Sequence, residues 1–597
     1  MGKRADVVLV ISGLIFVLEF KVGPSKYHSH DKDQVLDYAL DLKHFHAGSH
    51  EAVVVPMLVA TEAEPIETQY QSFGLDQDGL ASLLCANRRN IGIFVQRCVD
   101  LWRDRLNKVQ EPTDWAASAY KPTPTIVQAA QALYQGHNVQ EISRSDAGAK
   151  NLSETAFAIG AVIEQAKQKH EKCICFVTGV PGAGKTLAGL NITTDRMRAH
   201  EDEHAVFLSG NGPLVAVLRE ALARDQRERE RIPKKDADRK AATFIQNIHH
   251  FRDDNVGVET PPIEKVVVFD EAQRAWDQAN TSKFMQQKRQ QPGFDLSEPE
   301  FLVKVMDRRH DWCVIVALIG GGQEINTGEA GLPEWFAALR RSFSHWHVYY
   351  SNYLEGEEYT QGVPLTQHLN GLQSESNAAM HLGVSVRSFR AEKLSEFVGC
   401  LIGNKPTQAK ALYQQIQNAY PVVLTRNLHM ARHWLKRQAR GSELFGLVAS
   451  SGATRLKPEG INVKAKVSPA EWFLNGKRDV RSCQYLEDVA TEFDIQGLEL
   501  DWVGVCWDAN YRYIYDRTEA GHWSYNKFSG TKWQTVKNED RKRYLANSYR
   551  VLLTRARQGM IIFVPRGDDS DPTRPESYYT GIYRYLLTCG IKETESD

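Results

Sequence analysis

The sequence predicts an α/β protein with a small, mixed-sheet N-terminal domain followed by two larger domains that each contain a parallel sheet. Three observations lead to this prediction. The chain has 597 residues, too many for one core and enough for three or four domains. Apolar runs of strand length end in glycine, small polar or acidic residues, as strands do at the ligand-binding edge of a parallel sheet. Two β-rich runs near the N-terminus flank Ser12-Gly13, a pair typical of a two-residue hairpin turn.

The composition limits the kinds of partner. Lys and Arg number 73 and Asp and Glu number 74, so a nucleic-acid partner would be held by local basic surface and not by a general excess of positive charge. The nine cysteines are scattered without a CxxC pair, which predicts reduced thiols and a cytoplasmic protein. No apolar run approaches the ~20 residues of a membrane span, so we expect no membrane association.

The N-terminal hairpin is predicted to bring two carboxylates together. The register of a two-residue turn places Asp6 directly opposite Glu19. Cross-strand neighbours have Cβ atoms about 4.5–5.5 Å apart, so the two side chains can share one divalent cation, Mg²⁺ or Mn²⁺. Lys21 falls on the same strand face as Glu19, because strand side chains alternate. Two acidic ligands beside an ammonium group are what metal-dependent phosphodiester hydrolysis requires; a charged strand end without chemistry is the alternative.

These residues resemble the PD-(D/E)xK nuclease superfamily, with Asp6 as the first acid and Glu19-x-Lys21 as the E-x-K motif. Gln34 and Tyr38 on the following helix resemble the Q-x-x-x-Y motif of the RecB-like branch, and their spacing puts them on one helix face. The resemblance implies a nuclease site with Asp6 and Glu19 as metal ligands and with catalytic roles for Asp6, Glu19, Lys21, Gln34 and Tyr38. Such nucleases start with a helix that supplies a further acid, whereas five residues precede Asp6 here. Either the start is internal, or this helix is lost and cleavage is impaired.

A phosphate-binding loop follows the apolar strand predicted at 173–177. The sequence from Gly179 to Thr186 matches G-x-x-x-x-G-K-[ST] and opens into a helix, which is the context that the motif needs. Its glycines let backbone N–H groups surround phosphate oxygens, and the helix N-terminus adds its dipole. We expect Lys185 to contact the β- and γ-phosphates and Thr186 to hold Mg²⁺. The residues expected at the nucleotide are Gly179, Val180, Pro181, Gly182, Ala183, Gly184, Lys185 and Thr186.

A second buried strand, 264–269, ends in Asp270 and Glu271. Ligand sites of open α/β sheets lie at the carboxyl ends of their strands, so we expect Asp270 to hold Mg²⁺ and Glu271 to be the general base for the attacking water. A third such strand leads to Gln323, which can contact the γ-phosphate. Arg555 is expected on a helix of the last domain, from which it can reach the triphosphate; such a residue typically contributes ~10³–10⁵ in rate.

The ordered motifs over roughly residues 170–570 resemble superfamily 1 helicases. Two segments, G-G-G-Q-E-I-N-T-G-E-A-G and S-V-R-S-F-R, are most similar to the bacterial schlafen-group helicase-like domain. The resemblance implies ATP as the nucleotide, Arg387 and Arg555 as sensors of the γ-phosphate, and Glu499 as part of the segment that links nucleotide to strand. In the general superfamily an acid stands three residues before the switch glutamine, whereas this chain has Gly320 there. Expected strand contacts are Ser209, Asn211, Thr425, Arg426 and Thr491, and Gln496 and Gly497 are expected to couple nucleotide to strand.

We therefore predict a nuclease-like domain at 1–120, a helical linker at 121–165, and RecA-like domains at 166–395 and 396–597, with a β-hairpin insertion near 508–547. The predicted function is an ATP-dependent DNA helicase or translocase fused to a metal-dependent nuclease, acting in DNA processing or anti-phage defence with a protein partner. One alternative is a nucleotide-gated switch that licenses cleavage without unwinding. Another is a binding protein with an inactive front domain, and RNA is an open alternative to DNA.

Overall fold

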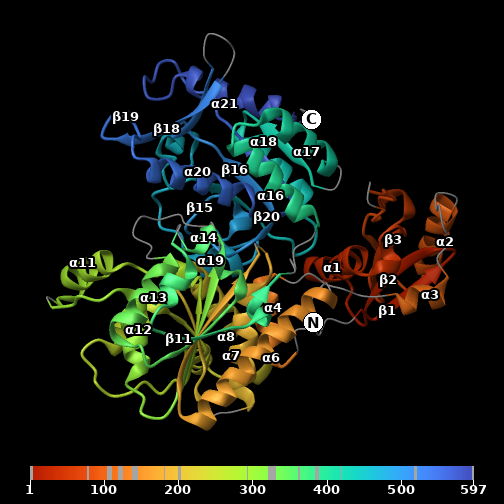
Figure 1. Ribbon diagram of the computed structural model, residues 1–597. Helices are drawn as coiled ribbons and strands as arrows, with labels where there is room; N and C mark the ends of the chain where they lie inside the picture. The colour runs from red at the N-terminus through yellow and green to blue at the C-terminus, as the bar shows by residue number, and fades with distance from the viewer. Residues whose placement is uncertain are drawn as a thin grey trace. The chain divides into compact units, whose positions relative to one another are not determined.

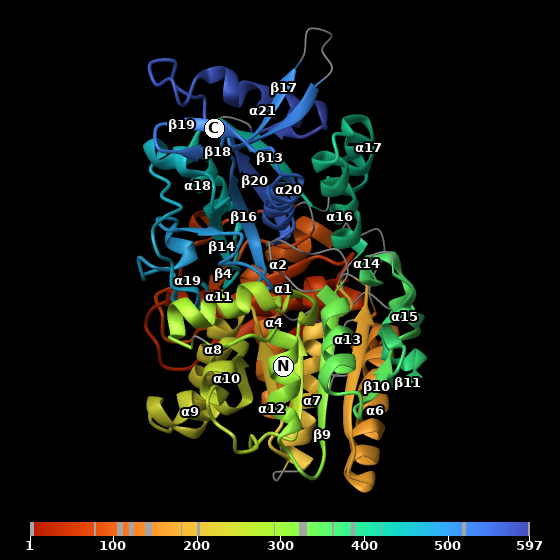
Figure 2. The same cartoon turned by 60° about the vertical axis from the view of Figure 1, so that its left-hand side comes forward.

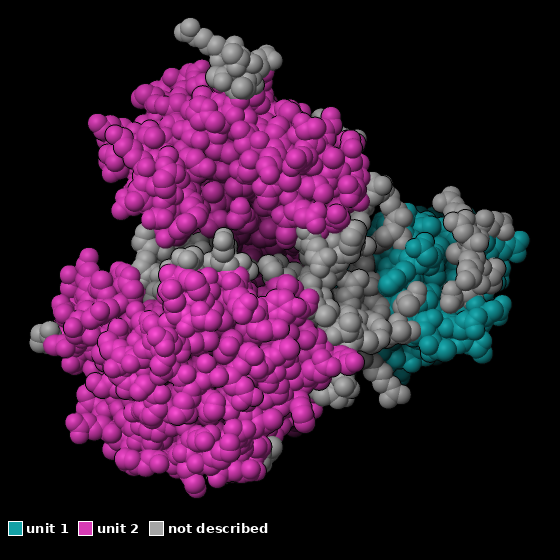
Figure 3. Space-filling model, viewed as in Figure 1, with its two compact units in different colours: residues 1–124, 141–145, 436–444 teal, residues 125–140, 146–435, 445–597 magenta. Residues whose placement is uncertain are grey.

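The computed structural model describes residues 5–76, 79–103, 111–118, 125–137, 146–180, 182–199, 203–291, 293–320, 331–360, 363–383, 389–417, 420–515 and 521–594. They form two compact units, each with its own sheets (Figures 1 and 3). Unit 1 contains residues 1–124, 141–145 and 436–444, and unit 2 contains the remainder. Unit 1 has one mixed sheet. Unit 2 has two parallel sheets and one small antiparallel sheet.

Unit 1 is built on a four-stranded sheet in the order β1-β2-β3-β4. The predicted hairpin is confirmed: Ser12 and Gly13 have φ of 51° and 79°, the left-handed pair that a type I′ turn requires. Ile11 pairs with Leu14, and the ladder runs on to Val7 opposite Leu18. The bounds are β1 Val7–Ile11, β2 Leu14–Lys21, α1 Ser29–Phe45, β3 Val54–Ala60, β4 Leu84–Ala86, α2 Ile91–Trp102 and α3 Pro112–Ala117.

The two faces of this sheet are covered by different helices. Odd-numbered side chains of β2, such as Val17, pack with Val35 of α1, and even-numbered ones, such as Leu18, pack with Phe94 of α2. This alternation follows from the period of two in a strand. Glu19 and Lys21 continue the odd-numbered series, so they lie on the face that α1 covers.

The first lobe of unit 2, residues 125–140 and 146–383, has an eight-stranded parallel sheet in the order β11-β10-β5-β9-β8-β6-β7, with β12 paired to β5. Its strands are β5 Lys172–Gly179, β6 Val206–Ser209, β7 Ile245–Asn247, β8 Val266–Asp270, β9 Cys313–Gly320, β10 His347–Tyr350, β11 Gln373–Ser376 and β12 His381–Leu382. Its helices are α4 Ile126–Gln135, α6 Asp146–Lys169, α7 Lys185–Ala199, α8 Gly212–Glu230, α9 Lys234–Phe244, α10 Ile248–Asn255, α11 Gln278–Arg289, α12 Glu298–Asp307, α13 Gly331–Ser342, α14 Glu357–Thr360 and α15 Leu365–Leu369.

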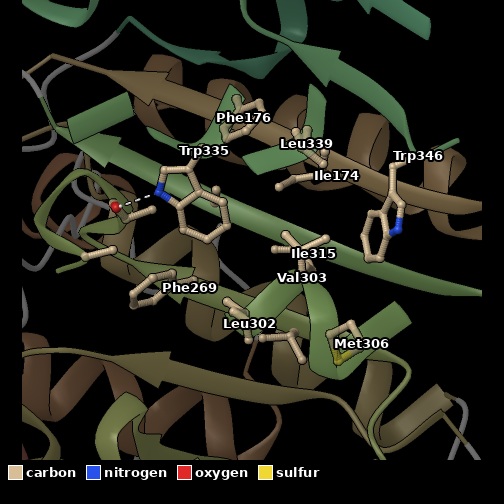
Figure 4. Close-up of a cluster of buried hydrophobic side chains, with 14 of the residues drawn as sticks. Ile174, Phe176, Phe269, Leu302, Val303, Met306, Ile315, Trp335, Leu339 and Trp346 are labelled. Atoms are coloured by element: carbon tan, nitrogen blue, oxygen red, sulfur yellow. Dashed lines mark hydrogen bonds between the residues drawn. The ribbon is translucent and has the colours of Figure 1, made fainter. Parts of the chain in front are cut away.

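Helices cover both faces of the first-lobe sheet (Figure 2). On one face α7 lies so close that a Cβ on Gly189 would be 2.7 Å from Leu318 Cδ1. On the other, α12 and α13 enclose a core that includes Ile315, Trp335 and Trp346 (Figure 4). The helices α4 and α6, in the region predicted as a linker, are part of this lobe, and Thr155 of α6 donates to Ala379 O at 2.7 Å.

The second lobe, residues 389–435 and 445–594, has a six-stranded parallel sheet in the order β15-β14-β16-β20-β13-β21. Its strands are β13 Val422–Thr425, β14 Phe445–Ala449, β15 Val489–Thr491, β16 Leu500–Cys506, β20 Ala556–Phe563 and β21 Lys592–Glu593. Its helices are α16 Phe389–Ile402, α17 Pro406–Ile416, α18 Leu428–Gln438, α19 Pro469–Leu474, α20 Glu539–Leu553 and α21 Glu576–Thr588.

The segment predicted as a β-hairpin insertion near 508–547 contains two antiparallel strand pairs and the start of a helix. It forms three antiparallel strands, β17 Tyr511–Tyr515, β18 Gly521–Ser529 and β19 Lys532–Thr535. Its last residues belong to α20, because Asn538 caps that helix through Arg541 N. Within the described residues, no helix combines the length and the apolar character needed to cross a membrane, and all nine cysteines are free thiols.

Candidate functional site

The phosphate loop connects β5 to α7. Gly182 and Gly184 have φ of 79° and 80°, a conformation that glycine adopts without steric strain and that turns N–H groups inward. Lys185 Nζ donates to Gly179 O at 2.9 Å and to Val180 O at 3.4 Å. The ammonium group therefore lies over the loop where a phosphate oxygen would bind. Pro181 lies outside the described residues.

A polar pair suited to Mg²⁺ lies next to the loop. Thr186 Oγ1 donates to Asp270 Oδ2 at 3.0 Å, although the two residues are 84 positions apart. Asp270 is buried at the end of β8; this burial, together with the charge of Glu271, raises the pKa of its carboxyl group. A hydroxyl and a carboxylate are hard oxygen ligands, and Mg²⁺ sites commonly combine one or two of these with substrate phosphates. The donor set therefore fits Mg²⁺ bound together with a nucleotide.

Glu271 is held in an unusual conformation by its neighbours. Its φ is 54°, which is uncommon for a residue with a side chain and frequent near active sites. Gln273 Nε2 donates to Glu271 Oε2 at 2.5 Å, and Gln273 Oε1 accepts from Gly320 N at 3.0 Å. Gln273 thus links the carboxylate to the end of β9. This role of Gln273 leaves no signal in the sequence, because its partner Gly320 is 47 positions away.

Gly320 lies between the phosphate loop and the acidic pair, because β9 is hydrogen-bonded to both β5 and β8. A Cβ at this position would lie 3.3 Å from Gln273 Nε2, 3.4 Å from Glu271 Oε2 and 3.5 Å from Lys185 Cε. A side chain at this position would therefore be in direct contact with all three groups, most tightly with Gln273, and a carboxylate there would stand beside that of Glu271. This packing gives a physical reason for the departure noted in the sequence.

A buried tryptophan fixes the turn that carries Glu271. Trp335 of α13 is fully buried and its indole N–H donates to Ala272 O at 2.9 Å (Figure 4). Ala272 stands between Glu271 and Gln273, so the core of the lobe holds the backbone of the acidic motif directly.

An exposed aromatic ring lies beside the loop. Tyr353, 56% exposed, stacks on His381 with ring centroids 3.7 Å apart. His381 Nδ1 is 2.8 Å from Thr178 Oγ1 on β5, and burial together with the charge of Lys185 lowers the pKa of His381. Val180 N donates to Leu382 O at 3.0 Å, so this pair is joined to the phosphate loop. The sequence analysis did not single out Tyr353.

Two of the other expected nucleotide contacts, Gln323 and Arg387, lie outside the described residues. The expectation that Arg555 is on a helix is wrong. Helix α20 ends at Leu553, and Arg555 lies in the turn before β20, where its Nε donates to Val551 O at 3.2 Å and its carbonyl accepts from Leu500 N. After the helix the backbone pairs with β16 instead, because Leu500 N donates to Arg555 O and Ala556 pairs with Leu500. Glu499 directly precedes β16.

Most of the residues expected to touch a nucleic-acid strand are engaged within the protein. Asn211 Oδ1 accepts from Leu214 N and caps α8, while its Nδ2 donates to Gln496 O at 2.7 Å. Gly497 has φ of 73°, and a Cβ there would be 2.9 Å from Asn211 Nδ2. Asn211 therefore joins the two lobes at the segment expected to couple nucleotide to strand. Ser209, Thr425 and Thr491 are buried, and Arg426 donates to the carbonyls of Pro565 and Arg566.

In unit 1 the four nuclease-like residues on β2 and α1 form one hydrogen-bonded network. Glu19 Oε1 accepts from Lys21 Nζ at 3.0 Å and from Gln34 Nε2 at 2.8 Å. Lys21 Nζ also donates to Gln34 Oε1 at 3.0 Å, and Gln34 Nε2 is 2.9 Å from Tyr38 Oη. The structure thus brings Glu19, Lys21, Gln34 and Tyr38 together. Asp6 lies in a bend directly before β1, where its Oδ2 accepts from the backbone N–H of Phe20 at 2.8 Å.

Asp31 is a further acid in this network that the sequence analysis missed. It is buried in the first turn of α1, and its Oδ1 is 3.5 Å from Lys21 Nζ. Burial lowers the pKa of Lys21, but the hydrogen bond and charge of Glu19 and the charge of Asp31 outweigh that effect and raise it. An acidic residue in the first turn of a helix is a common helix-start signal. The sequence alone therefore gives no reason to assign Asp31 a second role.

Glu19 offers an oxygen that fits a metal ion. The residue is 3% exposed, and its Oε2 is buried without a hydrogen-bond partner among the described residues. An unpaired buried carboxylate oxygen is costly, and a bound cation would remove that cost. No group of three His, Cys, Asp or Glu side chains in the described part of the chain forms a complete metal site. A metal in either unit would therefore take part of its ligands from water or phosphate.

Comparison with known proteins agrees with the first of these two sites. The profile of the schlafen group 3 DNA/RNA helicase domain matches residues 172–566. The matched range is more than half of the chain and runs from β5 through β20, so it contains the phosphate loop, the acidic pair and Gly320. No curated protein matches the chain. The chain therefore belongs to the schlafen group 3 family of DNA/RNA helicase domains.

Proposed function

We propose that the protein hydrolyses ATP and couples this reaction to movement along, or remodelling of, DNA. The observation that carries the proposal is that the phosphate loop after β5 meets the acidic pair at the end of β8, on the two sides of β9, with Thr186 Oγ1 3.0 Å from Asp270 Oδ2. A nucleotide triphosphate, Mg²⁺ and an attacking water need the same set of groups.

Each residue has a defined task in the proposed reaction. Loop amides bind the phosphates, and Lys185 exchanges its two loop carbonyls for phosphate oxygens. Thr186 and Asp270 would hold Mg²⁺, which when bound offsets phosphate charge. Glu271 accepts the proton of the attacking water, and Gln273 keeps its carboxylate in place. Tyr353 offers a stacking surface for the base next to the loop.

The bond between Asn211 and Gln496 O supports coupling between the lobes, because it joins the start of α8 to the loop before β16. We propose that a conformational change in the first lobe, caused by nucleotide binding or hydrolysis, is transmitted to the second lobe through this contact. The proposed setting is the cytoplasm, with DNA as the strand and a role in DNA processing or anti-phage defence; the defence role rests on family analogy.

The test compares Lys185→Ala and Glu271→Gln with the unsubstituted protein in ATP binding and in strand-stimulated ATP turnover. Both variants should lose turnover, and Glu271→Gln should still bind ATP. Normal turnover in Glu271→Gln would remove Glu271 from the role of general base. Turnover that rises with strand length, together with strand separation, supports a motor; stimulated turnover without either supports a nucleotide-gated switch.

A second proposed activity is metal-dependent DNA cleavage in unit 1. It is favoured by the network of Glu19, Lys21 and Gln34 and by the unpaired, buried Oε2 of Glu19. Glu19 and Asp6 would hold Mg²⁺ or Mn²⁺, which supplies Lewis-acid chemistry when bound. Lys21 then offsets the negative charge that develops on the phosphate.

The test is cleavage of linear, circular and single-stranded DNA, and of RNA, with and without ATP. Lys21→Ala should lose cleavage and keep ATP turnover. Cleavage that requires ATP would mean that unit 2 drives or licenses unit 1. Equal cleavage by Lys21→Ala and the unsubstituted protein would refute the site, and no cleavage by either would leave a binding protein with an inactive front domain.

A further inference from the structure

An exposed phenylalanine stands in a rigid loop of the second lobe. Phe493 follows β15 by two residues and is 40% exposed. The loop is closed by Asp494, whose Oδ2 accepts from Thr491 N at 2.8 Å and from Thr491 Oγ1 at 2.6 Å. A backbone bond from Asp494 N to Thr491 O, 2.9 Å, completes the turn. The ring of Phe493 is therefore presented by a fixed backbone.

Next to this exposed ring an acidic side chain is buried, which is the opposite of the usual placement of apolar and charged residues. Glu492, directly before Phe493, is 3% exposed, and its carboxylate accepts from Ser451 N at 2.7 Å and from Ser451 Oγ at 2.8 Å. Both acidic neighbours thus turn their carboxylates toward the protein while the aromatic ring faces outward. Charged residues are rarely as buried as Glu492, whereas Asp494 is partly exposed and is held by its bonds to Thr491.

The loop lies where the two lobes of unit 2 meet. Gln496 O accepts from Asn211 Nδ2 of the first lobe at 2.7 Å, three residues after Phe493. A Cβ on Gly497 would be 3.3 Å from Leu214 Cδ2 at the start of α8. A strand that crosses between the lobes would pass this junction.

A positive charge accompanies the ring. Lys464 is exposed, and its Nζ donates to Ser451 O at 3.0 Å; Ser451 is the residue that binds Glu492. This bond uses one of the three N–H donors of an ammonium group. The same short stretch of surface thus carries an aromatic face and a cation, while its two acids are turned inward.

We propose that Phe493 is a stacking surface for one base of a single-stranded nucleic acid, with Lys464 contacting a phosphate of the same strand. This inference rests on the proposed function and names a specific contact within it. Single strands bind proteins through aromatic faces and cations that follow the backbone, and every base has a face that can stack. The contact is therefore independent of base sequence and open to DNA and RNA alike.

The experiment measures binding of a labelled single strand of 12 nucleotides, as DNA and as RNA, by fluorescence anisotropy. One base stacked on an aromatic ring contributes about 1–3 kcal/mol, so Phe493→Ala should weaken binding by about 5- to 140-fold. Phe493→Tyr should restore it. Leu587→Ala is the matched control, because Leu587 of α21 is also 40% exposed in the same lobe, and it should bind like the unsubstituted protein.

Two further measurements separate the ring from the charge. On a strand that lacks bases, Phe493→Ala should bind as the unsubstituted protein does, because no base remains to stack. Phe493→Ala should leave the slope of log K against log salt unchanged, whereas Lys464→Ala should reduce it by about 0.7, the value for one phosphate of a single strand.

Different outcomes refute different statements. Strand binding by the unsubstituted protein that is unchanged in Phe493→Ala would overturn this inference and leave the proposed function in place. An equal loss on strands with and without bases would also overturn it, since the ring would then act through packing or a protein contact. Failure of the unsubstituted protein to bind any strand would overturn the proposed function itself.

Discussion

Replacement of Trp335 by phenylalanine tests whether the core of the first lobe positions Glu271, the proposed catalytic base. The substitution keeps an aromatic ring in a fully buried position and removes the indole N–H that donates to Ala272 O at 2.9 Å. The carbonyl is then left buried without its partner, which costs about 1–3 kcal/mol. If this whole free-energy cost is added to the activation barrier of ATP hydrolysis, turnover falls by about 5- to 160-fold.

Trp346 offers a matched control in the same core (Figure 4). It is also fully buried, and its indole N–H donates to Asp307 Oδ1 at 2.9 Å. The Asp307 side chain is 27% exposed and also binds Lys172, so it can replace the lost bond with water. We expect Trp346→Phe to lower stability by about 0.5–1.5 kcal/mol and to leave turnover unchanged.

The assay is steady-state ATP turnover at saturating nucleotide, with urea unfolding of the same preparations. The reasoning requires a loss of turnover in Trp335→Phe that exceeds the loss in Trp346→Phe at equal folded fraction. Normal turnover in a Trp335→Phe protein that is measurably destabilised would refute it, because the core would then support the fold without positioning Glu271.

Three other predictions follow from single contacts. Gly320→Asp should lower ATP turnover by more than about tenfold, or ~1.4 kcal/mol, because its Cβ would crowd Gln273 Nε2 at 3.3 Å and its carboxylate would stand beside that of Glu271. Steady-state kinetics would measure this, and full activity would contradict the reasoning. Asp6→Ala should abolish nicking of circular DNA and keep ATP turnover; loss of both would indicate misfolding or coupled units. Asn211→Ala removes a helix cap and the bond to Gln496 O. It should cost about 1 kcal/mol of stability and lower the ratio of strand-stimulated to basal turnover; an unchanged ratio would mean that this contact does not couple the lobes.

The local elements were determined by the sequence itself. A two-residue left-handed turn at Ser12-Gly13 fixes the register of its hairpin, because one cross-strand pair sets all the others. The strand, glycine-rich turn and helix start from Gly179 to Thr186 are adjacent in the chain, so their pattern carries their geometry. The spacing of Gln34 and Tyr38 likewise predicts their contact, since residues four apart share a helix face. Each of these is a short-range relation.

The contacts that complete the sites were decided by the tertiary structure. Gln273 meets Gly320 N across 47 positions, Trp335 reaches Ala272 O across 63, and Asn211 reaches Gln496 O across 285. No periodicity in the sequence encodes such pairs, because they depend on which strands become neighbours and how closely helices pack on them. The position of Arg555 after α20, and not within it, was settled in the same way by the strand that follows. The local sequence pattern indicated the proposed reacting groups of this protein, whereas packing over long sequence distances determined which residues hold each of them in place.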